Sequence, residues 1–137
     1  MFVPATLQLF SLHSMKEKNV NKNITTKTFF EKLKSLENNQ NTVFELQVTN
    51  QFKKSISLSY SRNFDLNLLL EIISLLVQNK PLPQKNHAHQ LKGQYVGVWE
   101  CHIKPDWLLL WKEDRERLIL LLLNTSTHSD FIGKRKK

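Results

Sequence analysis

The spacing of apolar residues predicts an ordered series of strands and helices from residue 44 onward. Residues 44–48 alternate between apolar and polar side chains, which is typical of a half-buried strand. In residues 50–60 the apolar side chains Phe52, Ile56 and Tyr60 recur every fourth position, as on one face of an α-helix. A second helix is expected over 66–78, where apolar side chains occur nearly all round. Such a helix packs on more than one neighbour, and any apolar part left exposed would attract a protein partner.

The last third of the chain predicts an antiparallel meander of three strands. Residues 95–103 are rich in β-forming side chains, and Lys104-Pro105-Asp106 is a tight-turn signal because proline presets the backbone of a turn. Residues 107–112 form a second apolar strand and residues 113–116 a charged turn. Residues 117–123 then form the third strand of the meander.

The expected register of this meander brings polar groups together at one end of the sheet. With the second hairpin centred on Asp114 and Arg115, Trp111 lies opposite Leu118 and Trp107 opposite Leu122. The start of the second strand therefore lies beside the end of the third. Titratable and polar groups from separate strand ends are expected to meet there: His102, Asp106, Trp107, Asn124 and His128.

Residues 1–43 differ from the remainder and are expected to form an N-terminal extension. They are rich in lysine and asparagine, and the polar stretch 16–23 is expected to be mobile. Met15 is a plausible alternative start. Thr25 or Thr26 can cap a short helix with four apolar side chains on one face, namely Phe29, Phe30, Leu33 and Leu36.

Composition favours a small cytoplasmic protein with a polyanionic partner. The 137 residues, 40% of them hydrophobic, suit one domain with one core. The single cysteine cannot form an intrachain disulfide, and no apolar run approaches the roughly 20 residues needed to span a membrane. The formal net charge of +8 attracts nucleic acid, although an asparagine- and lysine-rich composition also arises from nucleotide bias.

An ordered set of motifs lies within about 45 residues of the last third of the chain: His89, Leu91-Lys92-Gly93, Glu100-Cys101-His102-Ile103, Pro105-Asp106-Trp107, the Leu-Leu-Leu-Trp-Lys strand over 108–112, Thr125, Thr127-His128-Ser129-Asp130 and Gly133. This combination resembles the YafQ-type ribonuclease toxins of the RelE/ParE superfamily. No general rule of folding demands it, which makes it specific. The resemblance implies an α+β, RelE-like fold over 44–137, with two helices packed on a mainly antiparallel four-stranded sheet.

The resemblance also implies how RNA is cleaved and which residues take part. Histidine suits both proton transfers of the reaction because its unperturbed pKa of about 6.5 lies near working pH. His128 is then the general acid, and His102, Asp106 and His89 form the base side. Further residues are expected to contact RNA, with Trp107 stacking on a base for about 1–3 kcal/mol: Trp107, Lys92, Asn124 and Phe131. The structural alternative is that these histidines are surface groups and that Trp107, which shares a strand face with Leu109 and Trp111, belongs to the core.

No metal or cofactor is expected. His87, His89 and Cys101 together suggest zinc ligands, but Cys101 and His102 are adjacent in a strand and point to opposite faces. They cannot easily share one ion.

Two departures from the family pattern suggest weakened cleavage. Asn124 and Trp99 stand where the family usually has arginine, and asparagine carries no charge to stabilise a developing dianion. Lys92, Arg117 or the basic tail 134–137 could substitute in part. We therefore expect a toxin that cleaves mRNA, on the ribosome, and is silenced by an antitoxin protein. The alternatives are a degenerate member that binds its antitoxin without cleaving RNA, and a ParE-like inhibitor of DNA topology enzymes.

Overall fold

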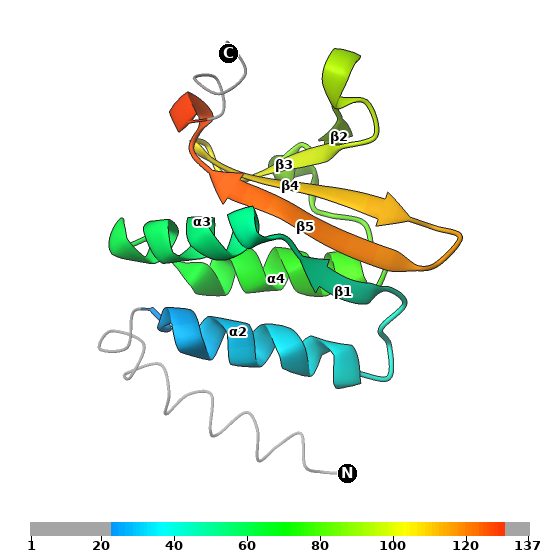
Figure 1. The fold of residues 1–137 in the computed structure, drawn as a ribbon, viewed down its shortest axis with the longest axis horizontal. Coiled ribbons are helices and arrows are strands. Elements are labelled where there is room, and N and C mark those ends of the chain that lie inside the picture. Colours follow the sequence, from blue (N-terminus) through cyan, green and yellow to red (C-terminus); the bar gives the residue numbers. More distant parts are fainter. Residues whose placement is uncertain (1–22, 131–137) are drawn as a thin grey trace.

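A mixed five-stranded sheet forms one layer of the protein, and helices cover one of its faces (Figure 1). A computed structural model describes residues 23–130. The strands follow the order β1-β5-β4-β3-β2 across the sheet. Their bounds are β1 Glu45–Val48, β2 His89–Gln90, β3 Trp99–Lys104, β4 Trp107–Asp114 and β5 Ile119–Ser126.

The expected α+β class is confirmed, but the expected four-stranded sheet has five strands in the described part of the chain. The additional strand is β2, which pairs antiparallel with β3 at the end of a segment expected to be an extended linker. A two-residue strand has too little pattern to be recognised from sequence. At the other edge β1 runs parallel to β5, with Glu45 beside Ile119, so the sheet is mixed.

Three α-helices within residues 23–130 form two further layers: α2 Thr26–Ser35, α3 Asn50–Ser61 and α4 Leu66–Val77. The side chains of Thr25, Thr49 and Asp65 accept hydrogen bonds from backbone N–H groups in the first turns of the three helices. These caps satisfy donors that a helix cannot pair internally. Helices α3 and α4 lie against the sheet, and α2 lies beneath them (Figure 1).

Helix α2 covers the apolar surface of α4 that the sequence analysis left for a partner. Phe29 and Leu33 of α2 are buried in the same core as Phe52 of α3 and Leu69 of α4. Every apolar side chain of α4 is buried or half-buried, because that helix is held between the sheet and α2. The segment before residue 44 therefore supplies part of the main core. The expectation of a mobile stretch over 16–23 lies largely outside the described residues.

The inner stripe of α3 differs from the expected one at its end. Phe52 and Ile56 are fully buried as predicted, whereas Tyr60 is 40% exposed. Ser55 and Ser59 are buried instead, and each donates its hydroxyl hydrogen bond to a carbonyl of its own helix. Because those bonds remove the cost of burying a hydroxyl, α3 can approach β5 closely along its serine side.

The register of the β4–β5 hairpin differs by four residues from the predicted one. Trp111 pairs with Leu122 rather than Leu118, because the connection is a four-residue turn over 115–118. The Asp114 carboxylate stabilises this turn by accepting hydrogen bonds from the N–H groups of Glu116 and Arg117. Asn124, expected just beyond the strand, consequently lies within β5 opposite Leu110.

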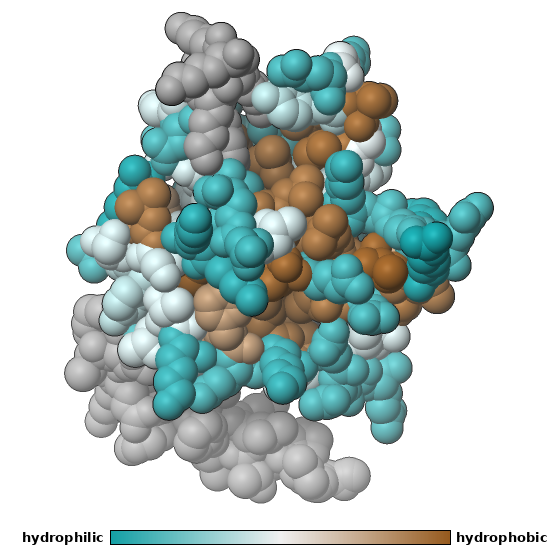
Figure 2. Space-filling model, viewed as in Figure 1, coloured by the Kyte–Doolittle hydropathy of each residue, from teal (hydrophilic) through white to brown (hydrophobic). Residues whose placement is uncertain are grey.

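Apolar side chains also reach the surface of the molecule around β5, as the band of brown in the space-filling view shows (Figure 2). Three apolar side chains of β5 are only half-buried: Ile119, Leu121 and Leu123. Among residues 23–130, no helix is both long and apolar enough to cross a bilayer.

Candidate active site on the outer face of the sheet

The sheet pairing gathers polar residues on the face turned away from the helices. Directly paired residues of neighbouring strands point to the same face. One row across the sheet joins His89 to Glu100, Leu110 and Asn124, and the next joins His102 to Leu108 and Ser126. The alternate row, through Trp99, Trp111 and Leu122, points into the main core.

A local bond to the backbone orients the imidazole of His102. Its Nδ1 lies 3.3 Å from the carbonyl oxygen of Pro105, in the turn that follows β3. A carbonyl oxygen can only accept a hydrogen bond, so Nδ1 is the protonated nitrogen when this bond forms. The lone pair of Nε2 is then free to take a proton from a substrate. The expected orienting group, Asp106, is not the one that contacts this ring.

His128 stands beside His102 at the end of the sheet. The centroids of the two imidazole rings are 6.4 Å apart. The backbone N–H of His128 donates a hydrogen bond of 3.2 Å to Oδ1 of Asp106. Asp106 thus holds the His128 segment by its main chain. The structure brings together His102, Asp106 and His128, from the end of β3, the β3–β4 turn and the segment after β5.

A second carboxylate, Asp130, anchors the segment that carries His128. It accepts hydrogen bonds from Ser126 Oγ and, at 3.1 Å, from Arg62 Nη1 at the end of α3. The hydrogen bond from Ser126 is the largest effect that lowers the pKa of Asp130, to about 2, with smaller contributions from Arg62 and Thr127. The sequence analysis did not identify Arg62, because its contact with Asp130 spans 68 residues.

His87 is a further histidine at this site that the sequence analysis considered only for metal binding. Its ring packs edge-on against His102, with 5.9 Å between the ring centroids. His87 has a left-handed backbone with φ of 50°, which is uncommon for a residue other than glycine. Asn86, directly before it, donates a 2.7 Å hydrogen bond to the His102 carbonyl and so ties this loop to β3. In the sequence, the position of His87 two residues before His89 was the only indication that it could belong to the same site.

His89 lies in a different set of contacts on the same face. Its Nε2 is 3.2 Å from Oε1 of the buried Glu100, and its Nδ1 is 2.8 Å from the carbonyl oxygen of His87. Both ring nitrogens thus lie against oxygen atoms of neighbouring groups, which hold the ring in place on this face. In the described part of the chain its contacts are with Glu100 and His87 rather than with the His102 ring.

The residues expected to contact RNA have unequal access to the site. Trp107 is only 2% exposed and packs on Phe64, with 5.0 Å between the ring centroids, which agrees with the core interpretation. Asn124 is 8% exposed on the outer face, and its Oδ1 has no hydrogen-bond partner among residues 23–130. Lys92 is exposed beside β2. Phe131 and the basic tail 134–137 lie outside the described residues.

Arg117 cannot take the place of the arginine that is missing at position 124. It lies in the turn at the opposite end of the β4–β5 hairpin from Ser126. Eight residues of β5 separate the two ends, about 25 Å at the usual rise per residue.

Cys101 is unavailable as a metal ligand on this face. It is fully buried in the main core, on the side of β3 opposite His102, as the alternation of the strand predicts. Burial, followed by the charge of Glu100, raises the pKa of its thiol to about 12. Across residues 23–130 no three histidine, cysteine, aspartate or glutamate residues form a group that could hold a metal ion.

The fold and this site place the chain in a known class of bacterial proteins. Residues 44–133 match the family model described as the YafQ bacterial toxin of type II toxin–antitoxin systems. The chain therefore belongs to the YafQ toxin family. It is 31% identical over 90 residues to the mRNA interferase toxin YafQ of Escherichia coli K12, covering 65% of this chain and 96% of the relative.

Solved structures agree with this membership. The crystal structure of E. coli BL21(DE3) YafQ matches with a TM-score of 0.61 and 30% identity, over 66% of this chain and 99% of that one. E. coli YafQ in its complex with DinJ matches with the same score, identity and coverage. A metal-bound toxin from Helicobacter pylori matches with a TM-score of 0.60 and 31% identity, over 64% of this chain and 97% of the toxin.

Proposed function

We propose that this chain is a toxin that cleaves mRNA by acid–base chemistry without a metal ion. The observation that carries the proposal is the pair of imidazoles, His102 and His128, 6.4 Å apart on one exposed end of the sheet. Each is positioned through backbone hydrogen bonds, to Pro105 and Asp106 respectively. Such a separation leaves room for a phosphate between a base on one side and an acid on the other. The relative named an mRNA interferase supports RNA as the substrate.

In the proposed reaction His102 Nε2 removes the proton from a ribose 2′-hydroxyl. The 2′-oxygen attacks the adjacent phosphorus, and the bond from phosphorus to the 5′-oxygen breaks. His128, protonated, donates its proton to that leaving oxygen, so the products are a 2′,3′-cyclic phosphate and a free 5′-hydroxyl. Asp106 acts by holding His128 in place. Each proton transfer of this kind contributes typically ~10²–10⁴ in rate.

Positive charge near the phosphate comes from histidine and lysine in this proposal. The base-side role expected for His89 becomes a positioning one, since its two ring nitrogens are held by the Glu100 carboxylate and the His87 carbonyl oxygen. Lys92 lies near it on the chain and is exposed. Asn124 faces the same side of the sheet without a charge, so we expect slower cleavage than in a relative with arginine there.

The test is to induce the full chain in bacterial cells and map new mRNA 5′ ends. Wild type should arrest growth and create 5′-hydroxyl ends, whereas His128→Ala and His102→Ala should create none. Lys112→Ala, an exposed change elsewhere on β4, serves as the matched control and should remain toxic. Parallel reactions on naked RNA and in a purified translation system, with and without a chelator, test the ribosome and metal independence. Growth arrest without new mRNA ends would contradict the proposal.

We further propose that an antitoxin protein silences the toxin in the cytoplasm. The solved DinJ–YafQ complex supports a partner of this kind. We expect an antitoxin segment that is disordered alone, with acidic residues placed over Lys53, Lys54 and Lys92 and covering His102 and His128. Co-expression of the toxin with the gene immediately upstream of its own, followed by affinity purification at rising salt concentration, tests this proposal. A toxin that purifies alone and harms no host would favour the degenerate alternative.

A further inference from the structure

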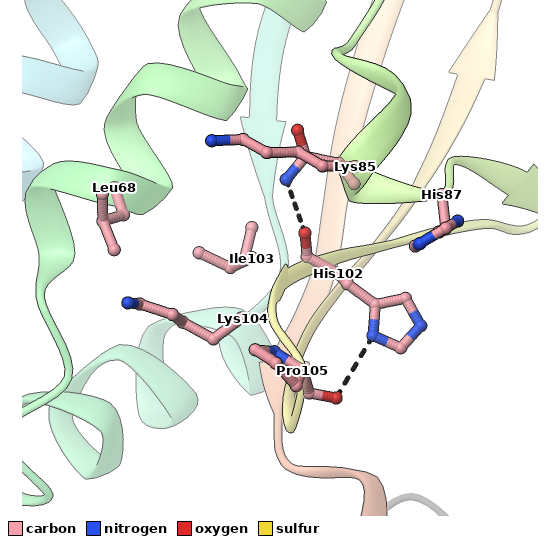
Figure 3. Close-up of a pocket in the computed structure, with 8 residues that line it drawn as sticks. Leu68, Lys85, His87, His102, Ile103, Lys104 and Pro105 are labelled. Carbon is pink, nitrogen blue, oxygen red and sulfur yellow. Dashed lines mark hydrogen bonds between the residues drawn. The ribbon is translucent and has the colours of Figure 1, made fainter.

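A pocket of about 580 Å³ adjoins His102 at the edge of the sheet. One wall is the loop that carries Asn86 and His87, and the other is the turn after β3. Leu68 of α4 and Ile103 supply apolar surface (Figure 3). His102 and His87 line it as well, so the pocket adjoins the proposed active site, while the His102 imidazole itself lies on the opposite side of β3 (Figure 3).

The charge of this pocket suits a phosphate. Lys85 and Lys104 extend their ammonium groups to the side of Leu68, whereas the His102 imidazole points away from that side (Figure 3). Within residues 23–130 neither lysine forms an ion pair, and none of the lining side chains is acidic. Two unpaired cations beside an apolar floor match the two parts of a nucleotide, its phosphate and its base.

The loop that forms the pocket is held rigidly enough to define a site. Asn86 is only 4% exposed and is bonded through Nδ2 to the His102 carbonyl. Its Oδ1, in the pocket wall, has no hydrogen-bond partner in the described part of the chain.

We propose that this pocket binds the nucleotide next to the scissile phosphate, with its phosphate on Lys85 and Lys104 and its base against Leu68, Ile103 and Pro105. The inference rests on the proposed ribonuclease function and adds a place where bases are selected. RNA is favoured over an antitoxin segment as occupant because Pro105 both lines the pocket and contacts the His102 imidazole through its carbonyl oxygen. In this proposal an RNA chain with its scissile phosphate at the His102 imidazole passes around the Pro105 turn and places its neighbouring nucleotide in the pocket.

The binding test uses the full chain with His128→Ala, so that a single-stranded RNA oligonucleotide is bound without being cut. Adding Lys85→Glu and Lys104→Glu should weaken binding at least ~10-fold and reduce the dependence of log Kd on log salt by about one phosphate contact or more. The matched control adds Lys27→Glu and Lys32→Glu on α2, on the far side of α3 and α4. It changes the net charge equally and should have little effect. Equal losses in both pairs would mean that only overall charge matters and would overturn the proposal.

The cleavage test replaces one base at a time by an abasic site in an RNA that wild type cuts. Wild type should lose activity at one position beside the cut, and the Lys85→Glu, Lys104→Glu chain should have lost that sensitivity. An unchanged abasic pattern would overturn the pocket while leaving the ribonuclease intact. Loss of antitoxin binding with RNA binding retained would make the pocket a protein-docking surface instead. Failure of wild type to cut any RNA would instead reject the proposed function.

Discussion

Asp106 contacts His128 through the backbone rather than through the imidazole: its Oδ1 accepts the His128 N–H at 3.2 Å, across 22 residues of sequence. A carboxylate near two histidines is readily interpreted as a proton-transfer partner. Here the carboxylate links the β3–β4 turn to the segment after β5 by a hydrogen bond to the main chain. Its effect on catalysis should therefore pass through the position of the His128 ring.

Substitution of Asp106 separates these two roles. Asp106→Asn keeps an oxygen that accepts the His128 N–H, so cleavage should stay within about tenfold of wild type, whereas Asp106→Ala should lose ~10²-fold through misplacement. Single-turnover cleavage rates measure both. Adding Asp106→Ala to His128→Ala should cause little further loss, since both act through one group. If asparagine were as harmful as alanine, the negative charge would be what matters.

Removal of the proposed general acid should be the most damaging single change. His128→Ala should lower cleavage by ~10²–10⁴-fold and abolish growth arrest, because it removes the imidazole that stands across from His102 in the proposed reaction. Antitoxin binding and thermal unfolding should remain close to those of wild type, as the side chain is exposed. A well-folded His128→Ala protein that remains fully toxic would remove this residue from the mechanism.

An arginine at position 124 should accelerate cleavage at some expense of stability. Asn124→Arg places a charge on the outer face in the row of Glu100 and His89, and a gain of ~10-fold or more is expected if the phosphate lies there. Asn124 is only 8% exposed, so neighbouring side chains must move to fit arginine and Tm should fall by several degrees. Asn124→Gln, which adds bulk without charge, is the control. An equal gain in cleavage rate in the Asn124→Gln variant would show that charge is not the cause.

The anchor of the His128 segment should be sensitive to acid. Folding lowers the pKa of Asp130 from its ordinary 3.8 to about 2, so the ionised carboxylate stabilises the folded state above pH ~4. That stabilisation is lost as the pH falls toward 2. Thermal unfolding of wild type and Asp130→Asn between pH 5 and 2 measures it. The difference between them should shrink with acid, and a constant difference would contradict the assignment.

The cysteine should be unreactive in the folded protein. With a thiol pKa raised to about 12 and no exposed surface, Cys101 has almost no thiolate at pH 8. Iodoacetamide should therefore label it only after denaturation, as mass spectrometry would show. Cys101→Ala should retain cleavage and lose about 1 kcal/mol or more of stability through the small cavity it leaves. Rapid labelling of native protein would mean that β3 opens readily.

The sequence by itself determined the α+β class, the bodies of α3 and α4, and the family. These features depend on side-chain periodicity and on short motifs whose partners lie within a few residues. The meeting of His102, Asp106 and His128 also followed from strand order, and it survived an error of four residues in the β4–β5 register. It survived because β4 and β5 are both longer than predicted, so their far ends still lie side by side.

Only the tertiary structure decided which distant side chains contact one another. The cover of α2 over α4, the bond from Arg62 to Asp130 and the approach of His87 to His102 join segments that no local pattern links. Whether Trp107 faced RNA or the core depended on which face of β4 the helices covered. A strand pattern specifies that two faces alternate, but packing of distant elements chooses which of them is buried.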